Sequence, residues 1–177
     1  VNTELAQLGM STASIEVKLS PLTTHTAQGA EHVEFLVCTN PGQPAGSLSK
    51  IVSGGELSRI SLAIQVIAAQ HTNIPTLVFD EVDVGVGGAV AEVIGKLLRD
   101  LGKQGQVICV THLPQVASCA HHHMVASKST DGKTTESALS ALETVTRVKE
   151  IARMLGGSTI TDSTLGHAEE MLRLSAG

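Results

Sequence analysis

The alternation of apolar and polar residues predicts two strands in the first quarter of the chain. Ser14–Leu19 alternates strictly, with the period of two that is typical of a half-buried strand. His32–Thr39 is a second predicted strand, and it ends in the turn-forming segment Asn40–Pro44. Before both strands, Asn2–Gly9 is typical of the last turns of a helix that ends at a glycine.

Helices and strands are predicted to alternate in the middle of the chain. A helix should run from Ser53 to about Gln70 and carry four apolar residues on one face: Leu57, Ile60, Ile64 and Ile67. Two short apolar runs are typical of buried parallel strands: Thr76–Phe79 and Gln106–Thr111. After the first run, the glycine-rich turn Val84–Gly88 should lead into a helix to about Leu101. After the second, Pro114 should begin a short helix.

The last third of the chain has a different pattern. His122–Ser129 and Thr134–Leu142 are predicted strands, joined into a hairpin through Asp131-Gly132. Two closing helices are indicated by apolar residues at helical spacing: Val145, Val148, Ile151 and Leu155 in one, and Leu165, Ala168, Met171 and Leu172 in the other. The alternation of strand and helix predicts a layered α/β domain.

Composition narrows the possible functions. The 177 residues are enough for one domain, and 42% are apolar while 16% are charged, as in globular proteins. The net charge is −5, the twelve Lys and Arg are scattered, and two Phe are the only aromatic residues, so this segment is not predicted to grip nucleic acid itself. The three cysteines are irregularly spaced, and the best candidate for a membrane span, Ile60–Ala69, is only ten residues long and contains Gln65. We therefore expect a cytoplasmic protein without a membrane partner.

Two acidic residues follow the first apolar strand. In Thr76–Glu81 the strand ends at Asp80 and Glu81, at the end of a sheet where ligands bind in α/β folds. Asp80 could hold Mg²⁺, which prefers oxygen ligands. Glu81 could orient a water molecule that attacks a phosphate. Taken alone, a solvated strand end explains this motif equally well.

Two further segments suggest phosphate chemistry. Ser53-Gly54-Gly55-Glu56 begins a helix, where exposed N–H groups, a hydroxyl and two small residues suit an anion. The alternative is a simple serine N-cap, although a glycine inside a helix costs about 1 kcal/mol relative to alanine. The third segment is Thr111-His112 at a strand end, where His112 could contact a phosphate oxygen or serve only a structural role.

The order of these motifs resembles that of the ATP-binding-cassette ATPases. Ser53–Glu56 resembles their signature motif, Thr76–Glu81 their Walker B strand, and His112 their switch histidine. Ser53–Arg59 resembles the SMC branch in particular. Four stretches resemble a family of bacterial SMC-like proteins that repair DNA double-strand breaks: Asn40–Pro44, Asp80–Gly88, Val107–Ser118 and Ala152–Gly157. The resemblance covers essentially the whole chain.

This resemblance implies a fold and an activity. Residues 1–177 would form the C-terminal lobe of an ABC/SMC-type P-loop NTPase head, residues 1–9 would end a coiled-coil arm, and the cofactors would be ATP and Mg²⁺. The partners would be a second head, in a homodimer formed through ATP, the N-terminal P-loop lobe, and DNA bound by the intact protein. The implied site residues are Glu81 and His112 for catalysis, Asp80 for the metal, and Ser53, Gly54, Gly55 and Glu56 for the nucleotide.

The chain departs from the cassette pattern in two places. Gly87 stands where many cassette ATPases have an aspartate after Walker B. The P-loop motif G-x-x-x-x-G-K-[ST] is absent, because Gly132-Lys133-Thr134 has Ser127 where the first glycine is required, and a hairpin turn explains it better. We therefore expect a C-terminal part of a longer protein, with no ATPase activity of its own.

Two other classes of protein fit parts of the pattern. One is a degenerate half-cassette that serves as a non-enzymatic partner-binding module, which the joint presence of Ser53 and Glu81 disfavours. The other is a different cassette branch, such as a transporter subunit, which Ser-Gly-Gly-Glu disfavours. Arg59 could reach a phosphate or a partner head, or form a surface ion pair. The side chains of His121–His123 should alternate between faces, so they are not predicted to hold a metal.

Overall fold

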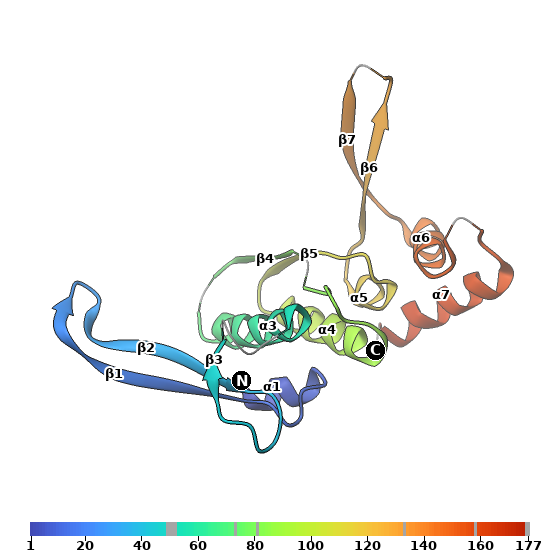
Figure 1. Cartoon of the computed structure of the whole chain (residues 1–177). Helices are drawn as coiled ribbons and strands as arrows, with labels where there is room; N and C mark the ends of the chain where they lie inside the picture. Colours follow the sequence, from blue (N-terminus) through green and yellow to red (C-terminus); the bar gives the residue numbers. More distant parts are fainter. Residues whose placement is uncertain (49–52, 73, 81, 133, 158, 176–177) are drawn as a thin grey trace. The chain divides into compact units, whose positions relative to one another are not determined.

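The computed structural model describes residues 1–48, 53–72, 74–80, 82–132, 134–157 and 159–175 (Figure 1). The chain divides into two compact units. Residues 1–74 and 84–86 form unit 1, and residues 75–83 and 87–177 form unit 2. Each unit is described below by itself.

The described residues of unit 1 form two helices and a small antiparallel sheet. Its elements are α1 (Asn2–Gln7), β1 (Ser14–Thr26), β2 (Gly29–Cys38), β3 (Gly46–Ser47) and α3 (Gly54–Gln70). The strands pair in the order β1-β2-β3, and β1 and β2 form a long hairpin (Figure 1). Both strands extend beyond their predicted ends, to Thr26 and from Gly29, because pairing continues past a shift in register after Pro21.

The predicted helix after Ser53 is confirmed as α3, but its predicted apolar face is only partly correct. Four side chains of α3 are buried: Ile60, Leu62, Ala63 and Val66. Ile64 and Ile67 are half-buried, and Leu57 is exposed. Apolar residues occur around most of this helix, so packing rather than helical spacing determines which face is buried.

Unit 2 carries the alternating part of the fold. Its elements are β4 (Thr76–Asp80), α4 (Gly88–Leu101), β5 (Gln106–Val110), α5 (Pro114–Cys119), β6 (Met124–Thr130), β7 (Thr135–Ala141), α6 (Thr144–Gly156) and α7 (Asp162–Ser175). All of these elements are at the predicted places. Among the described residues, β4 and β5 form a two-stranded parallel sheet, in register from Thr76 opposite Gln106 to Asp80 opposite Val110.

The prediction that β4 and β5 are buried is wrong for one face of their sheet. Phe79 is fully buried, whereas Val78, Ile108 and Val110 are 64%, 47% and 55% exposed. Side chains alternate between the faces of a strand, so these three exposed residues share one face. No element of the described part of the chain covers that face.

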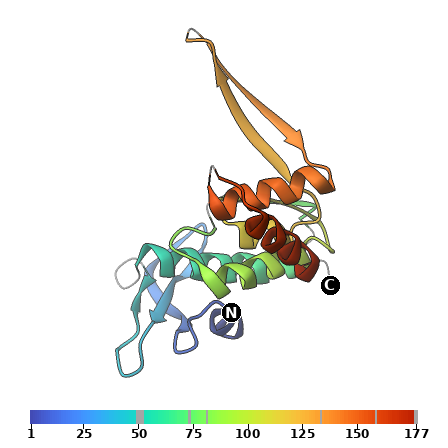
Figure 2. The ribbon, with the colours of Figure 1, turned by 90° about the vertical axis from the view of Figure 1, so that its right-hand side faces the viewer.

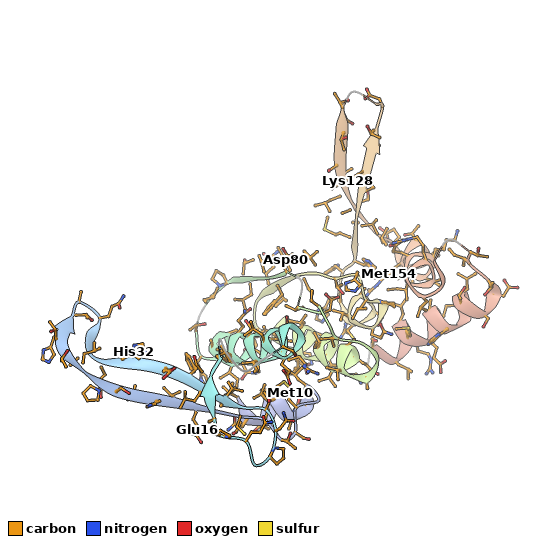
Figure 3. All side chains as sticks on the ribbon, viewed as in Figure 1. Met10, Glu16, His32, Asp80, Lys128 and Met154 are labelled. Atoms are coloured by element: carbon orange, nitrogen blue, oxygen red, sulfur yellow. The ribbon has the colours of Figure 1, made fainter. Side chains whose placement is uncertain are left out.

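The closing helices pack together, while the hairpin before them stands free. Ala117 of α5, Ile151 and Ala152 of α6 and Ala168 of α7 form a buried apolar cluster. Figure 2 shows α6 and α7 beside one another, with β6 and β7 extending away from them. The side chains of β6 and β7 are almost all exposed (Figure 3, where Lys128 is labelled).

The connection between β6 and β7 is the predicted hairpin turn. Gly132 has a φ of +85°, which glycine adopts at little cost, and the backbone N–H of Thr134 donates to Asp131 Oδ1 at 2.7 Å. Lys133 lies outside the described residues. Among the described helices, none is both long enough and apolar enough to cross a membrane.

The open sheet face predicts self-association of the 177-residue chain produced alone. An exposed apolar face on a short sheet with an unpaired strand edge favours contact with other chains. Light scattering should therefore show oligomers or aggregates. Ile108→Lys should increase the monomer fraction, whereas the control Gln104→Lys, which adds the same charge in an exposed turn, should not. A monodisperse wild-type monomer would contradict this expectation.

Candidate active site

The parallel sheet places two of the predicted site residues at one edge. Asp80 ends β4 opposite Val110, so Asp80 and the segment Thr111-His112 both lie at the carboxyl ends of their strands. The carboxylate of Asp80 is exposed there (Figure 3). Glu81, the next residue, lies outside the described residues. This edge is where an α/β sheet binds its ligands.

A buried carboxylate, that of Asp83, fixes the end of β5. Only 1% of Asp83 is exposed, and its Oδ2 accepts hydrogen bonds from the hydroxyl of Thr111 and, at 3.2 Å, from the backbone N–H of His112. The Thr111 hydroxyl oxygen also accepts from the N–H of Leu113 at 3.0 Å. A buried charge is stable only when such donors surround it, so Asp83 and this turn hold one another in place.

The same carboxylate lies beside the ring of His112. Asp83 Oδ2 is 3.5 Å from Nδ1 of His112, whereas 72% of the His112 side chain is exposed. The backbone of His112 is thus anchored while its ring is presented to solvent. A neighbouring carboxylate favours the tautomer that carries its proton on Nδ1. That arrangement suits a histidine that contacts a ligand through Nε2.

Asp83 is a functional residue that the sequence analysis does not single out. It is the third acid in Asp80-Glu81-Val82-Asp83, and an acid after a strand is usually solvated. Only its burial and its bonds to a segment 28 and 29 residues further on reveal its role. The one indication in the sequence is that three of the four residues from Asp80 to Asp83 are acidic.

The thiol next to this edge stays neutral. Burial raises the pKa of Cys109 to about 11, and the negative charges of Asp83 and Asp80 add to the shift. Cys109 lies opposite Phe79 in the sheet. It therefore contributes no charge near Asp80 at physiological pH.

Ser53 begins α3 as a full capping box. Its hydroxyl oxygen accepts from the N–H of Glu56 at 3.4 Å, and Glu56 Oε2 accepts from the N–H of Ser53 at 2.8 Å. The serine N-cap that the sequence analysis gave as the alternative is therefore present, and the helix begins where it was predicted. A hydroxyl that accepts a hydrogen bond can still donate its own proton. The cap and a bound anion are therefore compatible.

The charged residues of this first turn are coupled to the cap. The bond from the Ser53 backbone, then that from its side chain, lowers the pKa of Glu56, and the positive charge of Arg59 adds a smaller effect. Glu56 thus remains ionised and part of the cap well below neutral pH. Nε of Arg59 is buried and has no hydrogen-bond partner in the described part of the chain.

Packing restricts the two glycines in the first turn of α3, Gly54 and Gly55, to different degrees. A Cβ on Gly55 would lie 3.4 Å from the carbonyl oxygen of Gly85, and a Cβ on Gly85 would lie 3.2 Å from Cα of Gly55. Close approach of the two backbones, together with a φ of +69°, therefore explains Gly85, whereas a side chain at Gly55 would make only a close contact with it. A Cβ on Gly54 would meet nothing within 4 Å. Packing gives no reason for Gly54, whereas a ligand that approaches the backbone would.

The predicted site residues thus fall into two groups. Asp80 and His112 lie in unit 2, together with Asp83, and Ser53, Gly54, Gly55 and Glu56 lie in unit 1. Each group is well formed within its own unit. The two groups are not assigned to a common pocket.

Comparison with solved structures identifies the class of fold. One match is a chain from a study of ATP-driven dimerization and DNA-stimulated activation of SMC ATPases, with a TM-score of 0.64 and 19% identity over 89% of this chain and 90% of that chain. Another is the Smc head domain with a coiled coil and joint from Pyrococcus yayanosii, with a TM-score of 0.63 and 18% identity over 99% of this chain and 28% of that chain. The fold is therefore that of an SMC-type ATPase head, which confirms the predicted α/β class.

Comparison with curated sequences narrows this class. The chain is 50% identical over 173 residues to the DNA repair protein RecN of Vibrio cholerae, and 50% identical over 175 residues to that of Haemophilus influenzae. These matches cover 97% and 98% of this chain but 31% of each relative, so the chain spans about a third of their length. No protein-family profile matches the chain. The predicted resemblance to bacterial SMC-like repair proteins is confirmed, and the proteins that the chain resembles are RecN.

Removal of the Asp83 carboxylate should loosen the segment that carries His112. Asp83→Ala leaves the Thr111 hydroxyl and the His112 N–H without their acceptor, a loss of about 1–3 kcal/mol. Hydrogen–deuterium exchange in the peptide that covers residues 107–115 should then accelerate roughly 5- to 150-fold, if this loss governs local opening. Asp83→Asn keeps one acceptor oxygen and should have a smaller effect. The control is Asp100→Ala, which removes an exposed acid paired with Lys103. Equal exchange in Asp83→Ala and the control would remove Asp83 from this role.

Proposed function

We propose that the chain is the C-terminal lobe of the ATPase head of a RecN-type protein that acts in DNA double-strand-break repair. The observation that carries this proposal is the sheet edge at which Asp80 and the anchored His112 lie together, in a chain half identical to RecN over almost its whole length. The intact protein would bind and hydrolyse ATP with Mg²⁺, while this lobe alone would be inactive. Action on DNA would place the protein in the cytoplasm, at the nucleoid.

The described residues fit a magnesium–nucleotide ligand. Bound Mg²⁺ would neutralise charge on the phosphates, and the exposed carboxylate of Asp80 is the oxygen ligand available for it. Glu81 would orient the attacking water and accept its proton. The ring of His112, whose backbone is anchored by Asp83, would contact the γ-phosphate through Nε2, and it would donate a hydrogen bond there when both ring nitrogens carry a proton.

The start of α3 would serve a nucleotide held by a second head. The Ser53 hydroxyl can donate a proton, the N-terminal end of α3 carries a partial positive charge, and Gly54 leaves space for a close approach. Glu56 would support this surface through the capping box rather than touch the phosphate. The heads would join as a homodimer through ATP, each completed by its own P-loop lobe, and their opening would be coupled to DNA.

A change at Glu81 tests whether the intact protein is an ATPase of this kind. Glu81→Gln keeps the shape of the side chain but cannot accept a proton, and such acid–base contributions are worth roughly 10²–10⁴ in rate. The full-length variant should still bind ATP, measured by calorimetry, while single-turnover hydrolysis nearly stops. Hydrolysis at the wild-type rate would assign the base elsewhere. No ATP binding or hydrolysis in the wild type would favour the alternative, a non-enzymatic partner-binding module.

A complementation experiment tests whether Ser53 acts on the partner's nucleotide. Full-length Ser53→Arg and full-length Glu81→Gln should each be inactive as homodimers. In a mixed dimer, the intact Glu81 of one chain would face the intact Ser53 of the other, and the second site would carry both changes. If Ser53 acts in trans, mixing should restore up to half of the wild-type turnover per mixed dimer, provided that one site can work alone.

The control for this experiment is the formation of the mixed dimer itself. Two different affinity tags allow the mixed species to be isolated before its ATPase rate is measured. A pure mixed dimer that is inactive would argue for action of Ser53 in its own head or for strict coupling of the two sites. A fully active Ser53→Arg homodimer would exclude Ser53 from the mechanism.

A further inference from the structure

A cavity in unit 2 gathers positive charge away from the sheet edge. Its volume is about 620 Å³, and it lies where α4, the end of α5, the base of the β6–β7 hairpin and the start of α6 meet. Apolar side chains such as Met124 and Leu172 form part of its wall. Its charged or titratable lining residues are Arg99, His121, His122, His123, Glu143 and Arg147. The lining thus contains two guanidinium groups and three imidazoles but a single carboxylate.

The two arginines bind carbonyl groups and form no ion pair among the described residues. Arg147 Nη2 donates to the carbonyl oxygens of Ala117, Ser118 and Ala120 at 3.3, 3.1 and 2.5 Å, and Arg99 Nη1 donates to that of Cys119 at 2.8 Å. These bonds hold the end of α5, which is a structural role. Carbonyl oxygens carry no net charge, however, and no ion pair within the described ranges involves Arg99 or Arg147.

The environment of the cavity disfavours its own positive charges. Burial, followed by the charge of Arg99, lowers the pKa of both Arg147 and His121. Burial, followed by the charge of Arg147, lowers the pKa of His123, although Glu150 opposes this shift. Glu150 is itself held by Arg153 at 2.6 Å. The lowered pKa values leave His121 and His123 uncharged at neutral pH, so the positive charge is that of Arg99 and Arg147, and a bound anion would relieve the repulsion between these two.

Hydrogen-bonding groups without a partner at the cavity also favour a bound anion. Nε of Arg147 and Nδ1 of His123 are buried without a hydrogen-bond partner among the described residues. Helix α6 begins at the cavity with Glu143 as its N-cap, and no side chain caps its first N–H groups. The guanidinium group matches oxyanions in geometry, and the end of a helix adds partial positive charge.

We propose that this cavity binds a phosphate group, at a site separate from the sheet edge that carries Asp80 and His112. The volume accommodates a phosphate together with the sugar that bears it. The group would come either from a small phosphorylated molecule or from a nucleic-acid backbone. The net charge of −5 averages over the whole chain, so it allows a local cluster of this kind. The site does not depend on the proposed ATPase function.

The experiment uses the full-length protein with its nucleotide sites saturated by Mg-ADP. One probe is pyrophosphate, measured by calorimetry, and the other is a fluorescein-labelled 20-nucleotide single strand, measured by anisotropy. Arg99→Gln should weaken binding of one or both probes at least 10-fold. The matched control is Lys96→Gln, which removes one positive charge from the same helix outside the cavity, and it should change binding less than 2-fold. Loss of pyrophosphate binding alone assigns a small-molecule site, loss of the oligonucleotide alone assigns nucleic acid, and loss of both supports a phosphate site that admits either source.

Three further variants separate charge from folding. Arg99→Lys keeps the charge and should retain binding within about 3-fold, whereas loss of the Cys119 contact alone would weaken Lys and Gln variants equally. Glu143→Gln removes the opposing carboxylate and should tighten binding 2- to 3-fold. If Arg99→Gln unfolds, His121→Gln/His122→Gln replaces it, because both side chains are exposed. Binding that is the same in the cavity variants and in Lys96→Gln, for both probes, overturns the proposal.

Discussion

The buried carboxylate of Asp83 is the interaction on which the sheet edge depends. A charge that is 1% exposed must be matched by donors, and here the donors come from the turn that follows β5. The requirement works in both directions: the turn satisfies the carboxylate, and the carboxylate fixes the turn at the end of the neighbouring strand. The exposed ring of His112 is therefore carried on a rigid base, although it makes few contacts of its own. A residue that follows a strand is usually flexible. Here the bonds to Asp83 hold the backbone of His112 in place while its side chain stays exposed.

The start of α3 combines structure and chemistry in a different way. The capping box satisfies the N–H groups of Ser53 and Glu56 and keeps Glu56 ionised, while Gly55 lies against the backbone of Gly85. These features would be sufficient for a stable helix. Gly54 is unexplained by them, and glycine at a helix start is less favourable than many alternatives. Gly54 is thus the residue of Ser53–Glu56 that packing does not explain and that a bound ligand would explain.

Much of this organisation follows from local sequence. Apolar runs, helical spacing and the turn signals at glycine and proline predict the described elements of unit 2, and the residue types at Ser53 indicate its cap. Burial was less predictable, because it depends on what covers a face. The apolar residues of β4 and β5 indicate a buried sheet, yet Val78 and Ile108 are exposed in this chain. Asp83 was not predicted, since an acid paired with a turn 28 residues away has no local pattern.

The distribution of charge in the folded chain also cannot be predicted from local sequence or from the net charge. A net charge of −5 with scattered basic residues indicates no binding surface for anions when it is taken over the whole chain. The fold nevertheless brings Arg99 and Arg147, 48 positions apart in sequence, to one cavity with three histidines. Salt screens charges that are more than about 8 Å apart at physiological ionic strength, so the local arrangement determines what can bind. Acidic residues elsewhere in the chain reduce the net charge without neutralising this cavity, because the nearby Glu150 is already paired with Arg153. A protein with a negative net charge can therefore carry a site for a phosphate group where its fold brings arginines together without ion-pair partners.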